Sequence, residues 1–136
     1  MKKYLYIGAF GFCGAILRYV IKSASFGSIT ANFPINTLIT NVTGAFLIAL
    51  IFALTAKKIN ISEELKLGLT TGFLGAYTTF STLCKDTISL IESAKYSYAA
   101  IYVLLSVVLG ILAINLAQHM VKKIDKSYTN EKNTIS

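Results

Sequence analysis

Residues 72–82 read GFLGAYTTFST, and this stretch decides how the third apolar segment of the chain can fold. Glycine and β-branched threonine disfavour the interior of a helix, and the stretch places Gly72, Gly75, Thr78 and Thr79 close together. We therefore predict that the third helix breaks here, near the centre of the bilayer if the segment spans one. A break leaves backbone carbonyls without helical partners. At membrane depth such carbonyls must be covered by protein or must bind something, for example a monovalent cation.

The broken stretch lies inside residues 65–91, one of four apolar runs long enough to cross a membrane. The others are residues 4–21, 35–56 and 98–121. Of the 136 residues, 54% are hydrophobic and only 14% are charged, which is too little charge to cover the surface of a soluble domain. We predict an all-α integral membrane protein with four transmembrane helices.

The links between the segments set the domain limits and the orientation. We expect one membrane domain over residues 1–121 and a polar, flexible tail over residues 122–136. With four crossings, both termini and the link between the second and third segments share one side, which holds nine Lys and Arg residues against four on the other. The nine are Lys2, Lys3, Lys57, Lys58, Lys66, Lys122, Lys123, Lys126 and Lys132, and the four are Arg18, Lys22, Lys85 and Lys95. This bias favours cytoplasmic termini.

The basic residues lie between and beyond the apolar runs, so we expect no nucleic-acid partner despite the net charge of +7.

The titratable side chains count against two function classes, a proton-coupled exporter and an enzyme. All six are assigned to segment ends, links or the tail: Glu63, Glu64, Asp86, Glu92, Asp125 and Glu131. A proton-coupled exporter of cationic or guanidinium compounds needs a carboxylate within the membrane, so that reading loses weight. The single histidine, His119, has no carboxylate or nucleophile near it in sequence, and Cys13 and Cys84 lack the spacing of metal ligands. We expect no enzyme.

Neutral hydrogen-bonding side chains are dense in the last three segments. They are Asn36, Thr37, Thr40, Asn41 and Thr43, then Thr70, Thr71, Tyr77, Thr78, Thr79, Ser81 and Thr82, then Tyr102, Ser106 and Asn115. Such groups can join packed helices, or they can form a polar track for an anion that must lose water and leave again. Their spread over three segments favours the track. Phe80 can pack in a core or turn its electropositive ring edge toward an anion.

Glycines recur at every third position of the first segment, at Gly8, Gly11 and Gly14. Small residues along one face let another helix approach closely, so we expect a packed membrane helix here. A cleavable signal peptide is the less favoured reading.

Taken together, these motifs resemble the Fluc (CrcB) fluoride channel family over nearly the whole chain. Residues 11–19, GFCGAILRY, are similar to its first-helix motif, and residues 37–44, TLITNVTG, to its second-helix signature. Residues 72–82 are close to its third-helix motif, which is the most specific of the set. Tyr102 and Ser106 lie where the family carries fourth-helix pore hydroxyls.

The resemblance implies a four-helix subunit that pairs antiparallel with another copy or a paralogous chain. It also implies two fluoride pores at the interface and a central structural Na⁺, held by the backbone carbonyls of Gly75 and Thr78. Asn41 would donate its amide N–H to fluoride and Phe80 would present its ring edge. The polar track would be lined by Ser81, Thr82, Tyr102 and Ser106. Arg18 would attract anions into a vestibule, or else snorkel to the interface. The implied function is passive export of cytoplasmic fluoride across a prokaryotic plasma membrane, which reduces fluoride toxicity.

The chain departs from the family pattern at two positions. Leu83 replaces the second aromatic residue and has no quadrupole edge to offer, and Ala76 replaces the second glycine of the third motif. Leu83 and the charge bias together give the hypothesis of one half of an antiparallel heterodimer, with a homodimer as the alternative. Two other readings stay open: a dimeric four-helix exporter of cationic or guanidinium compounds, and a non-conducting partner subunit.

Overall fold

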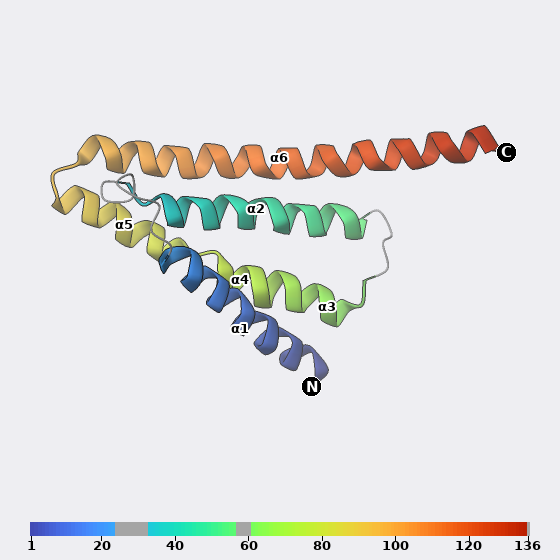
Figure 1. Cartoon of the computed structure of the whole chain (residues 1–136), viewed down its shortest axis with the longest axis horizontal. Helices are drawn as coiled ribbons and strands as arrows, with labels where there is room; N and C mark the ends of the chain where they lie inside the picture. Colours follow the sequence, from blue (N-terminus) through green and yellow to red (C-terminus); the bar gives the residue numbers. More distant parts are fainter. Residues whose placement is uncertain (24–32, 57–60, 136) are drawn as a thin grey trace.

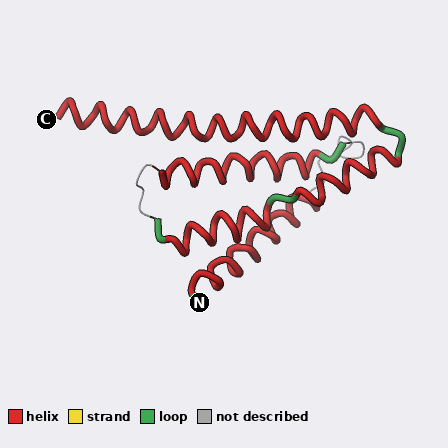
Figure 2. Tube along the Cα trace, turned by 180° about the vertical axis from the view of Figure 1, so that it is seen from behind, coloured by secondary structure: helices red, strands yellow, loops and turns green. Residues whose placement is uncertain are grey.

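The computed structural model of the chain describes residues 1–23, 33–56 and 61–135, with side chains as far as Ile124. Every regular element in these ranges is helical (Figure 1, Figure 2). The elements are α1 (Lys2–Ser23), α2 (Ile35–Ala56), α3 (Glu63–Leu67), η2 (Gly68–Leu74), α4 (Gly75–Tyr77), α5 (Phe80–Glu92) and α6 (Tyr96–Ile135).

The helices run back and forth along one long axis (Figure 1). α1 and the series from α3 to α5 run in one direction, while α2 and α6 run in the other. Both chain ends therefore lie toward the same end of the molecule, as predicted, and the turn between α5 and α6 lies at the opposite end. α1, α2 and residues 96–124 of α6 are each long and apolar enough to cross a membrane. The chain is a multi-pass membrane protein. The third predicted segment forms a series of shorter helices from α3 to α5 and is not one of these three candidate spans, so the fourth crossing stays a prediction.

The third apolar segment is broken at Thr78 and Thr79. The α3 helix starts at an N-cap, where Ser62 Oγ accepts from the Leu65 N–H at 3.3 Å, and it continues into the π-helical η2. The Thr78 N–H makes the last helical bond, to the Leu74 carbonyl at 3.0 Å. Thr78 (φ −82°, ψ 157°) and Thr79 (φ −154°, ψ 113°) are extended, and α5 then begins at Phe80. The predicted break is confirmed, whereas the π-helix was not predicted because it has no distinct residue pattern.

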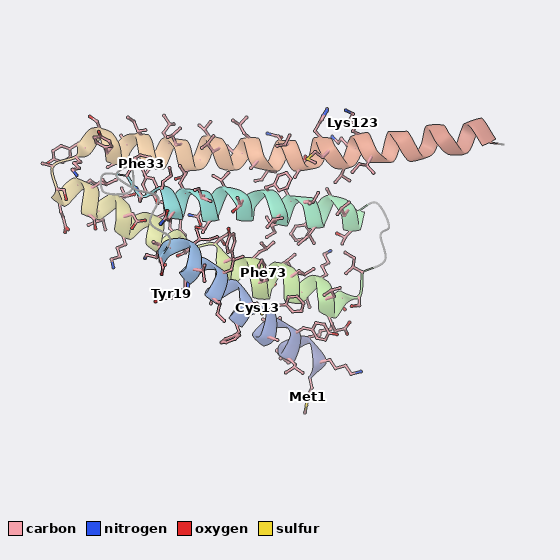
Figure 3. All side chains as sticks on the ribbon, in the orientation of Figure 1. Met1, Cys13, Tyr19, Phe33, Phe73 and Lys123 are labelled. Atoms are coloured by element: carbon pink, nitrogen blue, oxygen red, sulfur yellow. The ribbon has the colours of Figure 1, made fainter. Side chains whose placement is uncertain are left out.

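Glycines bring α1 against η2, and Phe73 marks the crossing in Figure 3. A Cβ on Gly14 would meet the Phe73 carbonyl oxygen, and a Cβ on Gly72 would lie 2.6 Å from the Ile7 carbonyl oxygen. The predicted close approach holds for Gly11 and Gly14, but it is wrong for Gly8, which has nothing within 4 Å. A step of six residues turns a helix by about 240°, so Gly8 and Gly14 point in different directions.

The core lies where α2, α5 and the first half of α6 meet. It consists of Leu38, Leu90, Ala99 and the fully buried Tyr102, whose ring meets Phe33 edge-on at 5.6 Å. Farther along α6, small side chains are buried: Ala113, Ala117 and Val121. The α6 helix continues to Ile135, so residues predicted to form a tail are helical. Their flexibility stays a prediction.

An ion pair links the beginnings of α1 and α3 at the end where the termini lie. Lys3 Nζ is 2.8 Å from Glu63 Oε2, and both side chains are exposed. The hydrogen bond from Lys3, and then its charge, hold the pKa of Glu63 below its ordinary value. Nearby, Lys66 Nζ lies 5.2 Å from the centroid of the Phe52 ring, a cation–π contact between α3 and α2.

Candidate functional site

Asn41 on α2 bonds to both backbone groups of Thr79 in the helix break. Its Oδ1 accepts from the Thr79 N–H at 2.8 Å, and its Nδ2 donates to the Thr79 carbonyl at 3.2 Å. In a continuous helix the Thr79 N–H would bond to the Gly75 carbonyl four residues earlier. Asn41 therefore diverts that donor and leaves the Gly75 carbonyl without its helical partner. An amide nitrogen carries two hydrogens, so Asn41 retains one for a ligand.

Three hydroxyl groups gather where α5 begins. Thr79 Oγ1 caps the helix by accepting from the Thr82 N–H at 3.2 Å. The same oxygen lies 3.0 Å from Ser81 Oγ and 3.1 Å from Thr82 Oγ1. The predicted site residues Ser81 and Thr82 are thus brought together at the break, beside the partial positive charge of a helix N-terminus.

Two cavities meet at Thr79. The first has a volume of about 220 Å³ and lies between α1, α2 and the break. Its lining residues are Ala15, Arg18, Tyr19, Lys22, Asn36, Thr37, Thr40, Thr79 and Thr82. It contains two cationic side chains and no acidic one, so its field attracts anions. The structure places Arg18 in this cavity together with Lys22, which the sequence did not single out. Arg18's role in a vestibule stays a prediction.

The second cavity, of about 340 Å³, lies on the other side of the break. It is lined by Asn41, Gly44, Ala45, Ile48, Thr70, Leu74, Gly75, Thr78, Thr79 and Phe80. Four predicted site residues therefore share one cavity: Asn41, Phe80, Gly75 and Thr78. Phe80 is 79% exposed, so this cavity opens onto the surface of the single chain.

A carboxylate lies between α2, α5 and α6. Asp86 Oδ2 accepts from Thr37 Oγ1 at 2.7 Å and from the Tyr102 hydroxyl at 3.4 Å. The prediction that every acidic residue lies at a segment end, in a link or in the tail is wrong for Asp86, which stands in the middle of α5. A new helix begins at Phe80, after the break, and its start determines the direction in which Asp86 points. The position of Asp86 within an apolar run does not show this, so the sequence could not predict that Asp86 contacts α2 and α6.

The remaining predicted residues stand apart from both cavities. Tyr102 is buried beside Asp86, and Ser106 Oγ donates to the Tyr102 carbonyl of its own helix at 2.7 Å. Leu83 packs against the core cluster, whereas Phe80, one turn earlier, is exposed. Within a single chain, the predicted track is divided between the break and the α5–α6 contact.

Comparison with known proteins identifies the family. The family model described as "CrcB-like protein, Camphor Resistance (CrcB)" matches residues 5–118. The chain belongs to the CrcB family.

Similar proteins cover nearly the same length as this CrcB chain. A protein of Geobacter metallireducens named "Fluoride-specific ion channel FluC" is 40% identical over 118 residues, which are 84% of this chain and 95% of that protein. "Fluoride-specific ion channel FluC 1" of Staphylococcus aureus (strain NCTC 8325 / PS 47) is 44% identical over 81% of this chain and 88% of its own. "Fluoride-specific ion channel FluC 2" of Listeria monocytogenes (strain EGD-e) is 36% identical over 89% of this chain and 92% of its own.

Membership of the CrcB family, and no longer the position of the carboxylates, counts against a cation exporter. The case against a cation exporter rested on the lack of a carboxylate within a segment, and Asp86 removes that support. The family match now carries the case instead.

Thr37, Thr79 and Lys22 also belong to the site, although the sequence marked the two threonines only as members of a polar group. Lys22 follows Arg18 by four residues, a helical spacing that could have marked it in the sequence. The two threonines share the cavity with Arg18 only because the helices pack together, so only the structure could select them.

Proposed function

We propose that this CrcB chain is a subunit of a fluoride-specific ion channel that passively exports cytoplasmic fluoride across the plasma membrane of a bacterium. The observation that carries the proposal is the Asn41 amide at the helix break, with one N–H to offer and the Phe80 ring in the same cavity. Uncharged donors can replace the hydration of a small anion and still release it. The basic cavity with Arg18 and Lys22 would gather anions next to this point. Transport of this kind involves no covalent step, so the protein is not an enzyme.

The proposed channel is an antiparallel dimer whose interface completes the fluoride pores. The support is the open cavity at Phe80, which a second chain would close, and the division of the polar groups within one chain. Ser81, Thr82, Tyr102 and Ser106 would then line the track. The charge bias and Leu83 favour a paralogous partner over a second copy. Relatives numbered FluC 1 and FluC 2 are compatible with paired chains.

The proposed dimer holds a structural Na⁺ at the break. The donor chemistry fits, because Asn41 draws the Thr79 N–H away from the Gly75 carbonyl. Gly75 and Thr78 also line the same cavity, and their carbonyl oxygens would be hard ligands for the ion. The ion would supply a fixed positive charge beside the anion path and would satisfy backbone groups that hydrocarbon cannot.

Fluoride efflux from liposomes tests the proposed function. Purified protein is reconstituted alone, and release of fluoride is compared with release of chloride from matched vesicles. Fluoride-selective efflux supports the channel and shows that one kind of chain suffices. Efflux that needs a paralogous chain supports the heterodimer. Silence in both arms from folded protein overturns the proposed function.

A further inference from the structure

One face of α2 contacts three successive residues at the break, namely Tyr77, Thr78 and Thr79. Asn41 bonds to the Thr79 backbone, as described above, and Gly44 faces the Thr78 methyl group so closely that a Cβ would clash with it. Between them, Thr43 Oγ1 lies 2.9 Å from the Tyr77 hydroxyl. The contact between Thr43 and Tyr77 joins α2 to the last residue of α4 and uses neither a predicted fluoride ligand nor a predicted sodium ligand.

The direction of this hydrogen bond follows from counting hydrogens. The Thr43 hydroxyl has one hydrogen, and its shortest acceptor is the Ile39 carbonyl at 2.7 Å. The Tyr77 hydroxyl is therefore the donor to Thr43 Oγ1. Tyr77 is only 4% exposed and stacks on Phe73 with centroids 6.0 Å apart. A phenol buried this deeply needs an acceptor, and Thr43 supplies it.

We propose that Thr43 and Tyr77 are positioning residues that fix the backbone of the helix break, and with it the Gly75 and Thr78 carbonyls. Tyr77 stands between these two residues in the chain, and each of the two carbonyls belongs to a peptide one step beyond those that flank Tyr77. Anchoring the Tyr77 side chain therefore limits how far the short segment that carries both carbonyls can move. Asn41 holds the peptide that carries the Thr78 carbonyl directly, through the Thr79 N–H, and it also holds the following peptide through the Thr79 carbonyl. A break held in advance binds a cation without first being ordered. This inference rests on the proposed function, because it assigns the two residues to the proposed Na⁺ site.

The test measures how Na⁺ protects the purified channel in detergent against thermal unfolding, with N-methylglucamine as the replacement cation. The channel is used in the form that conducts fluoride, either this full chain alone or this chain with its paralogous partner. Thr43→Val removes the acceptor, keeps the shape of the side chain and leaves a buried hydroxyl unpaired. We expect the Na⁺ concentration for half-maximal protection to rise about tenfold. Tyr77→Phe leaves nothing unpaired and should shift it less. The double variant should resemble Tyr77→Phe alone, because the two residues act as one contact.

Two control variants separate positioning from general stability. Thr43→Ser keeps the hydroxyl and should keep the wild-type Na⁺ midpoint. Thr55→Val removes another α2 hydroxyl, one bonded to the Ile51 and Phe52 carbonyls of its own helix. It should lower the Tm slightly without moving the Na⁺ midpoint. A Thr43→Val protein with a lower Tm and an unchanged Na⁺ midpoint would overturn the inference.

The same preparation distinguishes this inference from the proposed function. Wild-type protein that conducts fluoride but gains no protection from Na⁺ would overturn the inference and leave the channel standing. Wild-type protein that is protected by Na⁺ but does not conduct would overturn the channel, and the variants would still report on the cation site.

Discussion

At the residue scale, Asn41 combines two tasks that its amide can perform at once. Its oxygen and one hydrogen bond to Thr79, and the second hydrogen is left for a ligand in the cavity that Asn41 lines. Asn41→Asp keeps an acceptor for the Thr79 N–H, but it loses both donors and adds a charge that repels anions. We expect fluoride efflux to fall by about tenfold to a hundredfold in the liposome assay. Efflux at the wild-type rate from Asn41→Asp protein would contradict this role.

Asp86 is a structural link between three helices at the same scale. Asp86→Ala would leave the hydroxyls of Thr37 and the fully buried Tyr102 without their acceptor. We expect a loss of about 1–3 kcal/mol in the free energy of unfolding. Asp86→Asn keeps an acceptor oxygen and should lose less, and Lys85→Ala, at an exposed neighbour, should lose little. Chemical denaturation of the three variants in detergent would measure this, and equal losses would refute it.

At the scale of elements, the contact between α1 and η2 depends on one glycine more than on its neighbours. Gly14→Ala would push a methyl group into the Phe73 carbonyl, which is backbone and cannot turn aside. We expect a loss of about 1–3 kcal/mol or more, because the two helices must separate. Gly8→Ala meets nothing and should raise stability by roughly 0.5–1 kcal/mol. Thermal unfolding of both variants measures the two changes in stability. Similar losses in both would show that the close approach of Gly14 to Phe73 does not determine the stability of this contact.

The sequence predicted some of these elements better than others. The break was predictable because glycines and threonines inside an apolar run conflict with helix propensity, which is a local property. The π-helical η2 was not predictable, because its wider turn depends on how the segment packs on α1. Asp86 was misplaced for a related reason, since its direction depends on where α5 restarts.

At the scale of the whole molecule, the charge distribution should fix one orientation in the membrane. Both termini lie toward one end, on the side assigned nine of the 13 Lys and Arg residues. We expect a tag at either terminus to be found in the cytoplasm in nearly all molecules. Labelling of single introduced cysteines in intact cells, in variants lacking Cys13 and Cys84, would measure this. Equal populations facing inward and outward would contradict the heterodimer and favour two copies of one chain.

The sequence by itself determined that the chain is an all-helical membrane protein, and it determined the place of the break. These follow from apolar length, charge position and local propensity, which act along the chain. Only the tertiary structure decided which polar groups meet. It joined Asn41 to Thr79 and Thr43 to Tyr77, and it turned Asp86 toward Tyr102. These contacts join residues far apart in sequence, so they depend on how the helices cross and on the few glycines that let them approach.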